Sequence, residues 1–249
     1  MRILLIGDTH GNFAHLERRA RKAKVRFDVD VAFQLGDFGF VWDKRSAEKL
    51  FNLNEILAQI DLPLYWLDGN HENFELMEEE YGIDRLAPEF KQMFSHITYS
   101  GRGNTWEWDG VKFMSYGGAV SVDKGRRVPY LSWWPHEEII PEHVSALPNT
   151  KIDVLLSHDS PDIPDKLQTH LKMFGWGLSA KLEYESRQNS RQINRIIEKT
   201  RPHHAYHGHM HYDYKDVMEF PHGRVEVRGL NESSTGNAAI WIVDTEDLK

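Results

Sequence analysis

Five short apolar runs, each followed at once by glycine, aspartate, asparagine or histidine, constrain the fold of this chain more than any other feature. The runs are RILLI at 2–6, VAFQL at 31–35, LYWL at 64–67, IDVLL at 152–156 and HHAY at 203–206. Apolar runs of this length between turn residues are typical of buried strands. Apolar residues at helical spacing occur between several of them, at 13–24, 45–60 and 190–200. Strands that alternate with helices predict an α/β fold with a doubly wound, largely parallel sheet.

Three further segments predict antiparallel strands. Asp109 and Gly110 stand between two alternating runs in 105–116, which is a strong hairpin signal. Residues 216–230 resemble a second hairpin and 238–244 a closing strand. We therefore expect a second, more antiparallel sheet packed on the first. Because no repeat or linker divides the chain, residues 1–249 are expected to form a single domain.

Composition excludes several classes of site. The net charge of -8 disfavours a general surface for polyanions, so extended nucleic-acid binding is not expected. The chain has no cysteine, which excludes disulfides, thiolate zinc sites and cysteine nucleophiles and is compatible with the cytoplasm, the expected location. The first 11 residues predict a buried strand rather than a secretory signal. No run approaches the roughly 18 apolar residues of a membrane span, so no membrane partner is expected.

The residues that follow the five runs are candidate metal ligands. The blocks are Gly7-Asp8-Thr9-His10-Gly11-Asn12, Gly36-Asp37, Asp68-Gly69-Asn70-His71-Glu72, Ser157-His158-Asp159 and His207-Gly208-His209-Met210-His211. Ligands of open α/β sheets bind beyond the carboxyl ends of the strands, so we expect these blocks to meet at one edge. Glycines beside the ligands allow sharp turns and a close approach of the backbone. Carboxylate, imidazole and amide ligands suit manganese, iron, zinc, nickel or cobalt ions.

Each block also has a plainer explanation when it is taken alone. A helix cap, a loop turn or a strand-end histidine bonded to backbone accounts for any single one of them. For Asn12 we favour the helix cap, and His207 is expected to be structural. The other blocks stand in order at five strand ends, and that combination favours metal binding.

The order D-x-H, G-D, G-N-H-E, H and G-H-x-H resembles the calcineurin-like metallophosphoesterase superfamily between residues 7 and 211. The resemblance implies a four-layer α-β-β-α fold, a two-sheet β-sandwich flanked by helices, and two divalent metal ions, with Mn²⁺ favoured and Fe, Zn²⁺, Ni²⁺ or Co²⁺ as alternatives. It places one ion on Asp8, His10, Asp37 and His211, and the other on Asp37, Asn70, His158 and His209. Asp37 is then a bridging, catalytic ligand, and His71 matches the catalytic histidine near the leaving group.

The chain departs from the Ser/Thr protein phosphatases that GDTHGN and GNHE resemble. That branch reads G-D-x-V-D-R-G, whereas this chain reads Gly36-Asp37-Phe38-Gly39-Phe40-Val41, and Asp68 stands where an arginine is expected. Phosphoprotein phosphatase activity is therefore disfavoured. The partner that orients His71 stays open, since Glu72 can either serve as that partner or brace the loop.

Substrate contacts are expected from residues 119–140, between the third and fourth blocks. This segment offers Lys124, Arg126 and Arg127 for phosphate, and Trp133 and Trp134 for stacking on a base. The alternative is a solvated basic face with tryptophans packed on the core. Trp176, between two glycines, belongs either to a lid or, as we favour, to a packed turn.

The resemblance implies hydrolysis of a phosphoester, and small diesters such as 2′,3′-cyclic nucleotides are common substrates in this superfamily. We therefore expect a dinuclear phosphodiesterase for small or nucleotide diesters, with attack by a hydroxide that bridges the metals. A nuclease or phosphomonoesterase of the same fold is an alternative enzyme. A protein-binding scaffold without catalysis is the alternative from another class, but it is disfavoured because none of the eight matched positions is altered.

Overall fold

Two mixed β-sheets of six strands each form the centre of the molecule, in a computed structural model that describes residues 1–43, 45–174 and 177–249. In spatial order the first sheet consists of β12 (Ile240–Asp244), β1 (Arg2–Ile6), β2 (Val31–Gln34), β3 (Leu64–Trp66), β5 (Ile97–Ser100) and β4 (Phe90–Phe94). The second sheet consists of β10 (Tyr214–Phe220), β11 (Gly223–Gly229), β9 (His204–His207), β8 (Val154–Ser157), β7 (Val111–Tyr116) and β6 (Thr105–Trp108).

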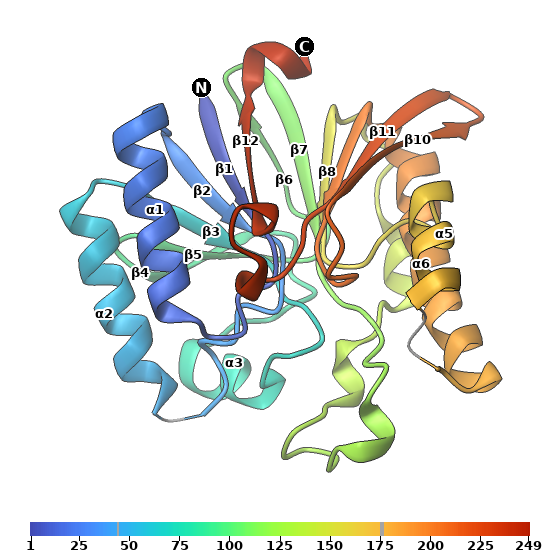
Figure 1. Cartoon of the computed structure of the whole chain (residues 1–249), viewed down its shortest axis with the longest axis horizontal. Coiled ribbons are helices and arrows are strands. Elements are labelled where there is room, and N and C mark those ends of the chain that lie inside the picture. Colours follow the sequence, from blue (N-terminus) through green and yellow to red (C-terminus); the bar gives the residue numbers. More distant parts are fainter. Residues whose placement is uncertain (44, 175–176) are drawn as a thin grey trace.

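Helices lie around the two sheets (Figure 1). They are α1 (Phe13–Phe27), α2 (Ser46–Gln59), α3 (Phe74–Tyr81), α4 (Pro141–Ala146), α5 (Asp165–Phe174) and α6 (Ala180–Thr200), with short 3-10 turns η1 (Lys124–Arg126), η2 (Pro135–Glu137), η3 (Ser233–Ala239) and η4 (Thr245–Leu248). Figure 1 shows α1 and α2 over the first sheet and α5 and α6 over the second. The expected two-sheet sandwich flanked by helices is confirmed.

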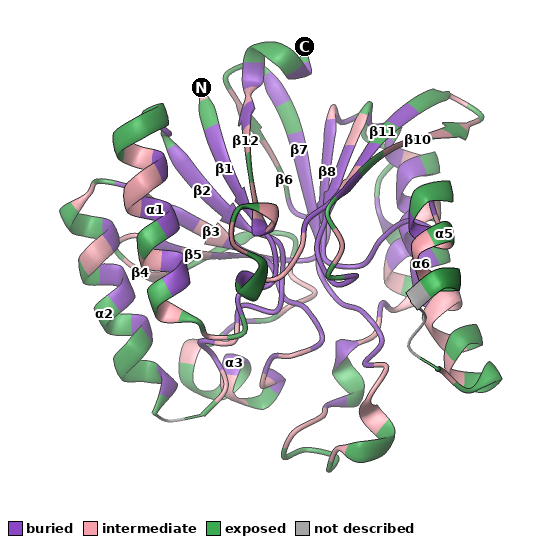
Figure 2. Cartoon of the chain, in the orientation of Figure 1, coloured by how far each residue is buried: buried purple, intermediate pink, exposed green. Residues whose placement is uncertain are grey.

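Strand β1 is apolar from Ile3 to Ile6 because successive side chains point to opposite faces of the sheet and both faces are buried. Leu4 and Ile6 belong to the cluster beneath α1 and α2, whereas Ile3 and Leu5 belong to the cluster between the sheets. A strand buried on both faces needs an apolar residue at nearly every position. Figure 2 shows the contrast between these buried strands and the exposed outer surfaces of the helices.

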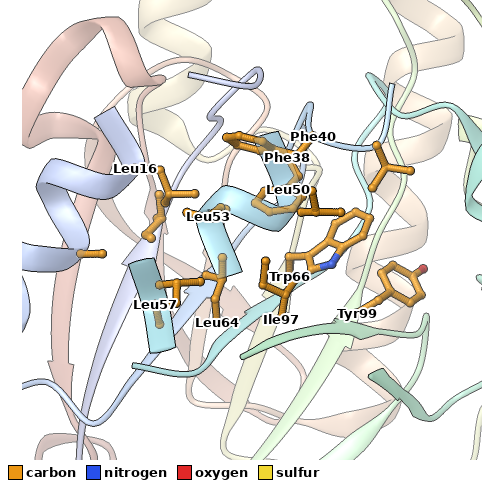
Figure 3. Close-up of a cluster of buried hydrophobic side chains, with 14 of the residues drawn as sticks. Leu16, Phe38, Phe40, Leu50, Leu53, Leu57, Leu64, Trp66, Ile97 and Tyr99 are labelled. Carbon is orange, nitrogen blue, oxygen red and sulfur yellow. The ribbon is translucent and has the colours of Figure 1, made fainter. Parts of the chain in front are cut away.

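Helix α2 illustrates how a helix packs on the first sheet. Its buried residues Leu50, Leu53 and Leu57 recur at helical spacing. Figure 3 shows them in one cluster with Leu64 and Trp66 of β3. The cluster packs α2 against β3, the strand that precedes the loop with Asn70 and His71.

The division of strands between the sheets corrects two expectations. The five motif-bearing strands do not share one sheet, because β1, β2 and β3 lie in the first and β8 and β9 in the second. The antiparallel segments form no sheet of their own: β12 pairs with β1 at one edge of the first sheet, while both hairpins flank the second. The apolar pattern of a segment identifies it as a strand but does not specify which strands it pairs with. Packing between the layers determines that pairing.

Several elements lie beyond what the sequence pattern identified. Helix α6 begins at Ala180, ten residues before the expected start, with Ser179 as its N-cap. Its buried residues lie between Asn189 and Thr200, and the apolar residues of its first turns, Leu182 and Tyr184, are not buried. The hairpin of β4 and β5 and the helices α3 and α5 were not expected. Gly175 and Trp176, considered for a lid, lie outside the described residues.

Both sheets direct their parallel strands toward the same region. β1, β2 and β3 run parallel in the first sheet, as do β7, β8 and β9 in the second. Figure 1 shows these strands running from the end that holds the termini toward loops in the middle of the molecule. All five motif blocks follow these strands. In the described ranges, no helix is long and apolar enough to cross a membrane.

Candidate metal centre

The loops after β1 and β2 are bonded to each other through their backbones. The carbonyl oxygen of Asp37 accepts hydrogen bonds from the amides of Thr9 at 3.1 Å and His10 at 2.8 Å. The Thr9 hydroxyl donates to the Phe38 carbonyl at 2.8 Å. Asn12 caps α1 by accepting from the amide of His15, as expected. These bonds fix the Asp8 and Asp37 side chains relative to each other.

Unusual backbone conformations concentrate at the candidate ligands. Ten non-glycine residues in the described ranges have positive φ, and four of them are His10, Asp37, His209 and His211. A non-glycine residue in this region costs on the order of 1–3 kcal/mol and persists only where its surroundings enforce it. The loops therefore store strain at the positions that bring these side chains inward.

Asp8, His10 and His211 form the first ligand group. The Nε2 atom of His211 lies 3.0 Å from Oδ2 of Asp8 and 3.3 Å from Nε2 of His10. His10 Nε2 lies 4.0 Å from Asp8 Oδ2 and 3.9 Å from Asp37 Oδ2. Candidate ligand atoms of these residues all lie within 4.8 Å of one another, which fits a single ion.

The second group is built around Asp37 and His158, whose candidate ligand atoms lie within 4.8 Å of each other and of Asp8, with Asn70 and His209 beside His158. His158 Nε2 lies 3.3 Å from Asp37 Oδ1 and 3.0 Å from Asn70 Oδ1. The other ring nitrogen of His158 lies 2.7 Å from the Leu35 carbonyl, so Nδ1 carries a proton and Nε2 faces the site. The His209 ring lies beside that of His158, with centroids 5.0 Å apart.

Two buried carboxylates and several imidazoles dominate the electrostatics of the site. In the described part of the chain the ion-pair partners of Asp8 and Asp37 are imidazoles, and backbone amides also donate to both carboxylates. Burial opposes the ionisation of Asp37, yet His71 and His158 hold its pKa well below the usual value. Burial also opposes a charged His158, but Asp37 raises the pKa of His158 to about 10. Two carboxylates, four imidazoles and an amide oxygen fit borderline divalent cations, which would take the place of protons held by the imidazoles.

Two glycines make room for the carboxylates. A Cβ atom on Gly69 would lie 2.1 Å from Asp37 Oδ1 and 2.7 Å from His158 Nε2. A Cβ atom on Gly208 would lie 2.2 Å from Asp8 Oδ1. Real Cβ contacts do not come this close, so the site requires glycine at both positions.

His71 and Arg127 lie together at the open side of the two groups. The His71 amide donates to Asp37 Oδ1 at 2.8 Å, and Arg127 Nη2 lies 2.6 Å from His71 Nε2. Burial lowers the pKa of His71, against the opposing effect of the Asp37 carboxylate. The Arg127 guanidinium is held by Asp123 at 2.8 Å and by the Ser132 carbonyl at 3.2 Å. Arg127 is therefore the basic residue of segment 119–140 that reaches the site.

Glu72 braces the loops instead of orienting His71. Its carboxylate accepts the amide of Phe38 at 2.6 Å and that of Gly69 at 3.0 Å, which ties the second block to the third. Burial and the nearby Asp37 raise the pKa of Glu72 well above its usual value. Of the two roles left open by the sequence, the structure supports bracing.

The remaining residues proposed for substrate lie elsewhere. Trp134 is buried in the core cluster against Trp42, so its expected stacking on a base is wrong. The Lys124 ammonium is engaged by Glu138 at 3.1 Å and Glu185 at 2.9 Å, and it lies over the Trp133 ring. Arg126 is exposed on the surface. The solvated face with packed tryptophans accounts for these four residues better than substrate contact.

A cavity of about 450 Å³ opens beside the site. Its lining includes His10 and His71 from the site and Trp42, Arg45 and Lys49 from the loop before α2 and from α2 itself. Sequence reasoning missed this wall, because neither basic residue lies in a recognisable motif. His207, by contrast, bonds the Tyr214 hydroxyl at 2.6 Å and is structural, as expected.

A buried ion pair and a buried hydrogen-bond chain also support the third block. Asp68 and Arg102 are both fully buried and joined at 2.6 Å. Asn70 is bonded to Ser121, which is bonded to Glu137. One feature of the sequence pointed to the ion pair, namely the aspartate in place of the expected arginine. No feature of the sequence pointed to the hydrogen-bond chain.

Comparison with known proteins agrees with this geometry. The model of the calcineurin-like phosphoesterase family matches residues 1–213, and the chain belongs to this family. It is accordingly a metal-dependent phosphoesterase. A search of curated proteins finds no match.

Among solved structures, a hypothetical protein from Thermus thermophilus is similar at 17% identity and a TM-score of 0.43, over 93% of this chain and 75% of that one. The sulfate thiohydrolase SoxB of the same organism, in complex with glycerol, is similar at 14% identity and a TM-score of 0.41. That match covers 96% of this chain but only 40% of SoxB. Similarity this distant carries no argument about activity.

Proposed function

We propose that this protein hydrolyses small phosphodiesters, including nucleotide diesters such as 2′,3′-cyclic nucleotides, with two divalent ions, Mn²⁺ being favoured. The observation that carries the proposal is the placement of Asp37. Its Oδ2 lies 3.9 Å from His10 Nε2, and its Oδ1 lies 3.3 Å from His158 Nε2. The Asp37 carboxylate thus lies near an imidazole of each ligand group, so this one side chain would hold both ions. When bound, the two ions supply charge neutralisation and a nucleophilic water at neutral pH.

The chain itself supplies positioning on the substrate side. Arg127, held by Asp123 and Ser132, donates to a phosphate oxygen in place of His71 when substrate enters. His71 donates a hydrogen bond to the departing oxygen. Both roles follow from the position of the two side chains beside Asp37 and at the mouth of the site.

The shape and charge of the adjoining cavity favour a small anionic substrate. Its volume of about 450 Å³ lies within the roughly 300–1,000 Å³ that is usual for small-molecule sites. Arg45 and Lys49 contribute positive charge to its wall and outnumber Asp43, the acidic residue of the lining. The chain as a whole carries a net charge of -8, which opposes binding of extended nucleic acid. A cysteine-free chain also fits the cytoplasm, where we propose that the protein acts.

Metal analysis combined with three substrates tests the proposal. The protein is loaded with Mn²⁺, its bound metal is measured, and hydrolysis of bis(p-nitrophenyl) phosphate, p-nitrophenyl phosphate and a 2′,3′-cyclic nucleotide is followed. We expect two ions per chain and faster hydrolysis of the diesters than of the monoester. Protein that binds two ions but is inert on all three substrates would instead support the scaffold alternative.

Asp37→Ala tests the bridging role directly. The variant should lose at least one ion and all hydrolysis, because one carboxylate serves both groups. Asp30→Ala, at an exposed aspartate just before β2, changes the same residue type at the opposite end of the same strand and should leave both properties intact. Retention of both ions and of the wild-type rate in Asp37→Ala would refute the assignment.

A further inference from the structure

The side-chain amide of Asn70 must be oriented before it can bind a cation. Its oxygen can coordinate a metal ion, whereas its NH₂ group would repel one. The two ends of an amide have nearly the same shape, so packing alone does not choose between them. In the structure Oδ1 lies 3.0 Å from His158 Nε2, and Nδ2 points away, 3.0 Å from the Ser121 hydroxyl.

The bonding of Ser121 selects this orientation. A serine hydroxyl has one proton to donate. Ser121 Oγ donates it to Glu137 Oε2 at 2.6 Å, while the Ser121 amide donates to Glu137 Oε1 at 2.6 Å. In its ionised form, the Glu137 carboxylate accepts both donors of Ser121. Only the lone pairs of the hydroxyl then remain for Asn70, and lone pairs accept from NH₂ but not from a carbonyl oxygen.

The chain of bonds is buried along its whole length. Ser121 and Glu137 are 0% exposed and Asn70 is 3% exposed. Water therefore cannot replace a missing partner, and a hydrogen bond in such surroundings has a larger effect than one at the surface. Three segments meet here: the loop after β3, the loop after β7 and the turn η2.

We propose that Ser121 and Glu137 are positioning residues that fix the Asn70 amide with its oxygen toward the second metal ion. The inference rests on the proposed dinuclear function and extends it to residues that touch neither ion. It also gives the buried part of segment 119–140 a role in the metal site. Outer partners of metal ligands typically change metal affinity by about 10- to 100-fold when they are removed.

Titration of Mn²⁺ into metal-free wild type and Ser121→Ala, followed by calorimetry, tests the proposal. We expect the affinity for one of the two ions to fall by about 10- to 100-fold and the affinity for the other to be unchanged. Ser100→Ala is the matched control, since it also removes a fully buried serine hydroxyl, one that is bonded to Ser115 and Asn104 and not to a ligand. The control should bind both ions as the wild type does.

The Asn70→Asp background separates orientation from general damage. A carboxylate presents an oxygen whichever way it turns, so Ser121→Ala should cause no further loss of affinity there. An equal loss in both backgrounds would overturn the proposal, as would wild-type affinity in Ser121→Ala. If Ser121→Ala does not fold, Glu137→Gln takes its place, because it keeps the size of the side chain and frees the orientation of the Ser121 hydroxyl. Unchanged Mn²⁺ affinity in Glu137→Gln would also overturn the proposal. Wild type that binds no Mn²⁺ would instead refute the proposed function.

Discussion

Replacement of Arg102 by methionine should destabilise the fold by several kcal/mol. Arg102 donates to Asp68 Oδ2 from Nη2 at 2.6 Å and from Nε at 3.0 Å, and both side chains are fully buried. It also donates to the carbonyls of Glu138 at 2.8 Å and Glu137 at 3.1 Å. Burial opposes the charge on Arg102, but Asp68 raises the pKa of Arg102 above its usual value. Loss of one partner of such a pair typically costs about 3–5 kcal/mol.

A second estimate concerns the carboxyl side of the pair alone. The carboxyl group that loses Arg102 keeps a hydrogen bond from the Tyr99 hydroxyl and can take up a proton, which for an ordinary aspartic acid at pH 7 costs about 4 kcal/mol, or 1.36 kcal/mol for each pH unit above about 3.9. The two estimates agree, and the second adds a pH dependence. The destabilisation should fall by about 2.7 kcal/mol between pH 7 and pH 5, because the free-energy cost of protonating the carboxyl group decreases by 1.36 kcal/mol for each of the two pH units.

Urea denaturation of the metal-free protein, followed by tryptophan fluorescence, measures both effects. Wild type and Arg102→Met are compared at pH 7 and pH 5, so that titrations common to both proteins cancel. The double variant Asp68→Asn with Arg102→Met buries no charge and should recover much of the loss. A cost below about 1 kcal/mol, the range of an exposed ion pair, or a cost that does not vary with pH, would refute the reasoning.

Three further predictions concern the site and its support. His71→Ala should retain both ions but slow hydrolysis most for esters with poor leaving groups, measured over a series of substituted phenyl esters; an equal loss for every leaving group would contradict the role. Gly69→Ala should lose metal because its Cβ would lie 2.1 Å from Asp37 Oδ1, whereas Gly125→Ala, with nothing within 4 Å, should bind metal normally. Burial raises the pKa of Glu137 from 4.5 to about 7, so its charged form is disfavoured in the folded state and stability is lost as the pH rises through that interval. The free energy of unfolding of metal-free wild type, relative to Glu137→Gln, should decline by about 3 kcal/mol from pH 4.5 to 7; a pH-independent difference would contradict it.

The local arrangement of the site was predictable because each motif block directly follows a strand. A parallel strand places the next residues at the carboxyl edge of its sheet, so Asp8, Asp37 and Asn70 were expected to meet. His158 and His209 follow strands of the other sheet and reach the same place because the two sheets pack face to face. The expectation of a common edge was therefore correct, although the single sheet from which it was argued was wrong.

Substrate contacts were less predictable, since composition does not tell a solvated face from a binding face. Lys124, Arg126 and Arg127 look alike in sequence. Only the fold turns Arg127 toward His71, while Lys124 meets Glu138 and Glu185 and Arg126 faces solvent. Trp134 could stack on a base as readily as fill a core, and the packing of α2 and segment 119–140 decides that it fills the core.

The sequence by itself determined the candidate ligand types, their order along the chain and the family, because residue chemistry and its position after a strand are local properties. The tertiary structure alone decided which sheet each strand joins and which basic side chain reaches the site. It also decided how Arg102 holds Asp68 and how Ser121 holds Asn70. Those choices depend on contacts between residues distant in sequence. Burial removes water as an alternative partner, so each such contact must be satisfied by one particular neighbour, and local pattern does not specify which neighbour that is.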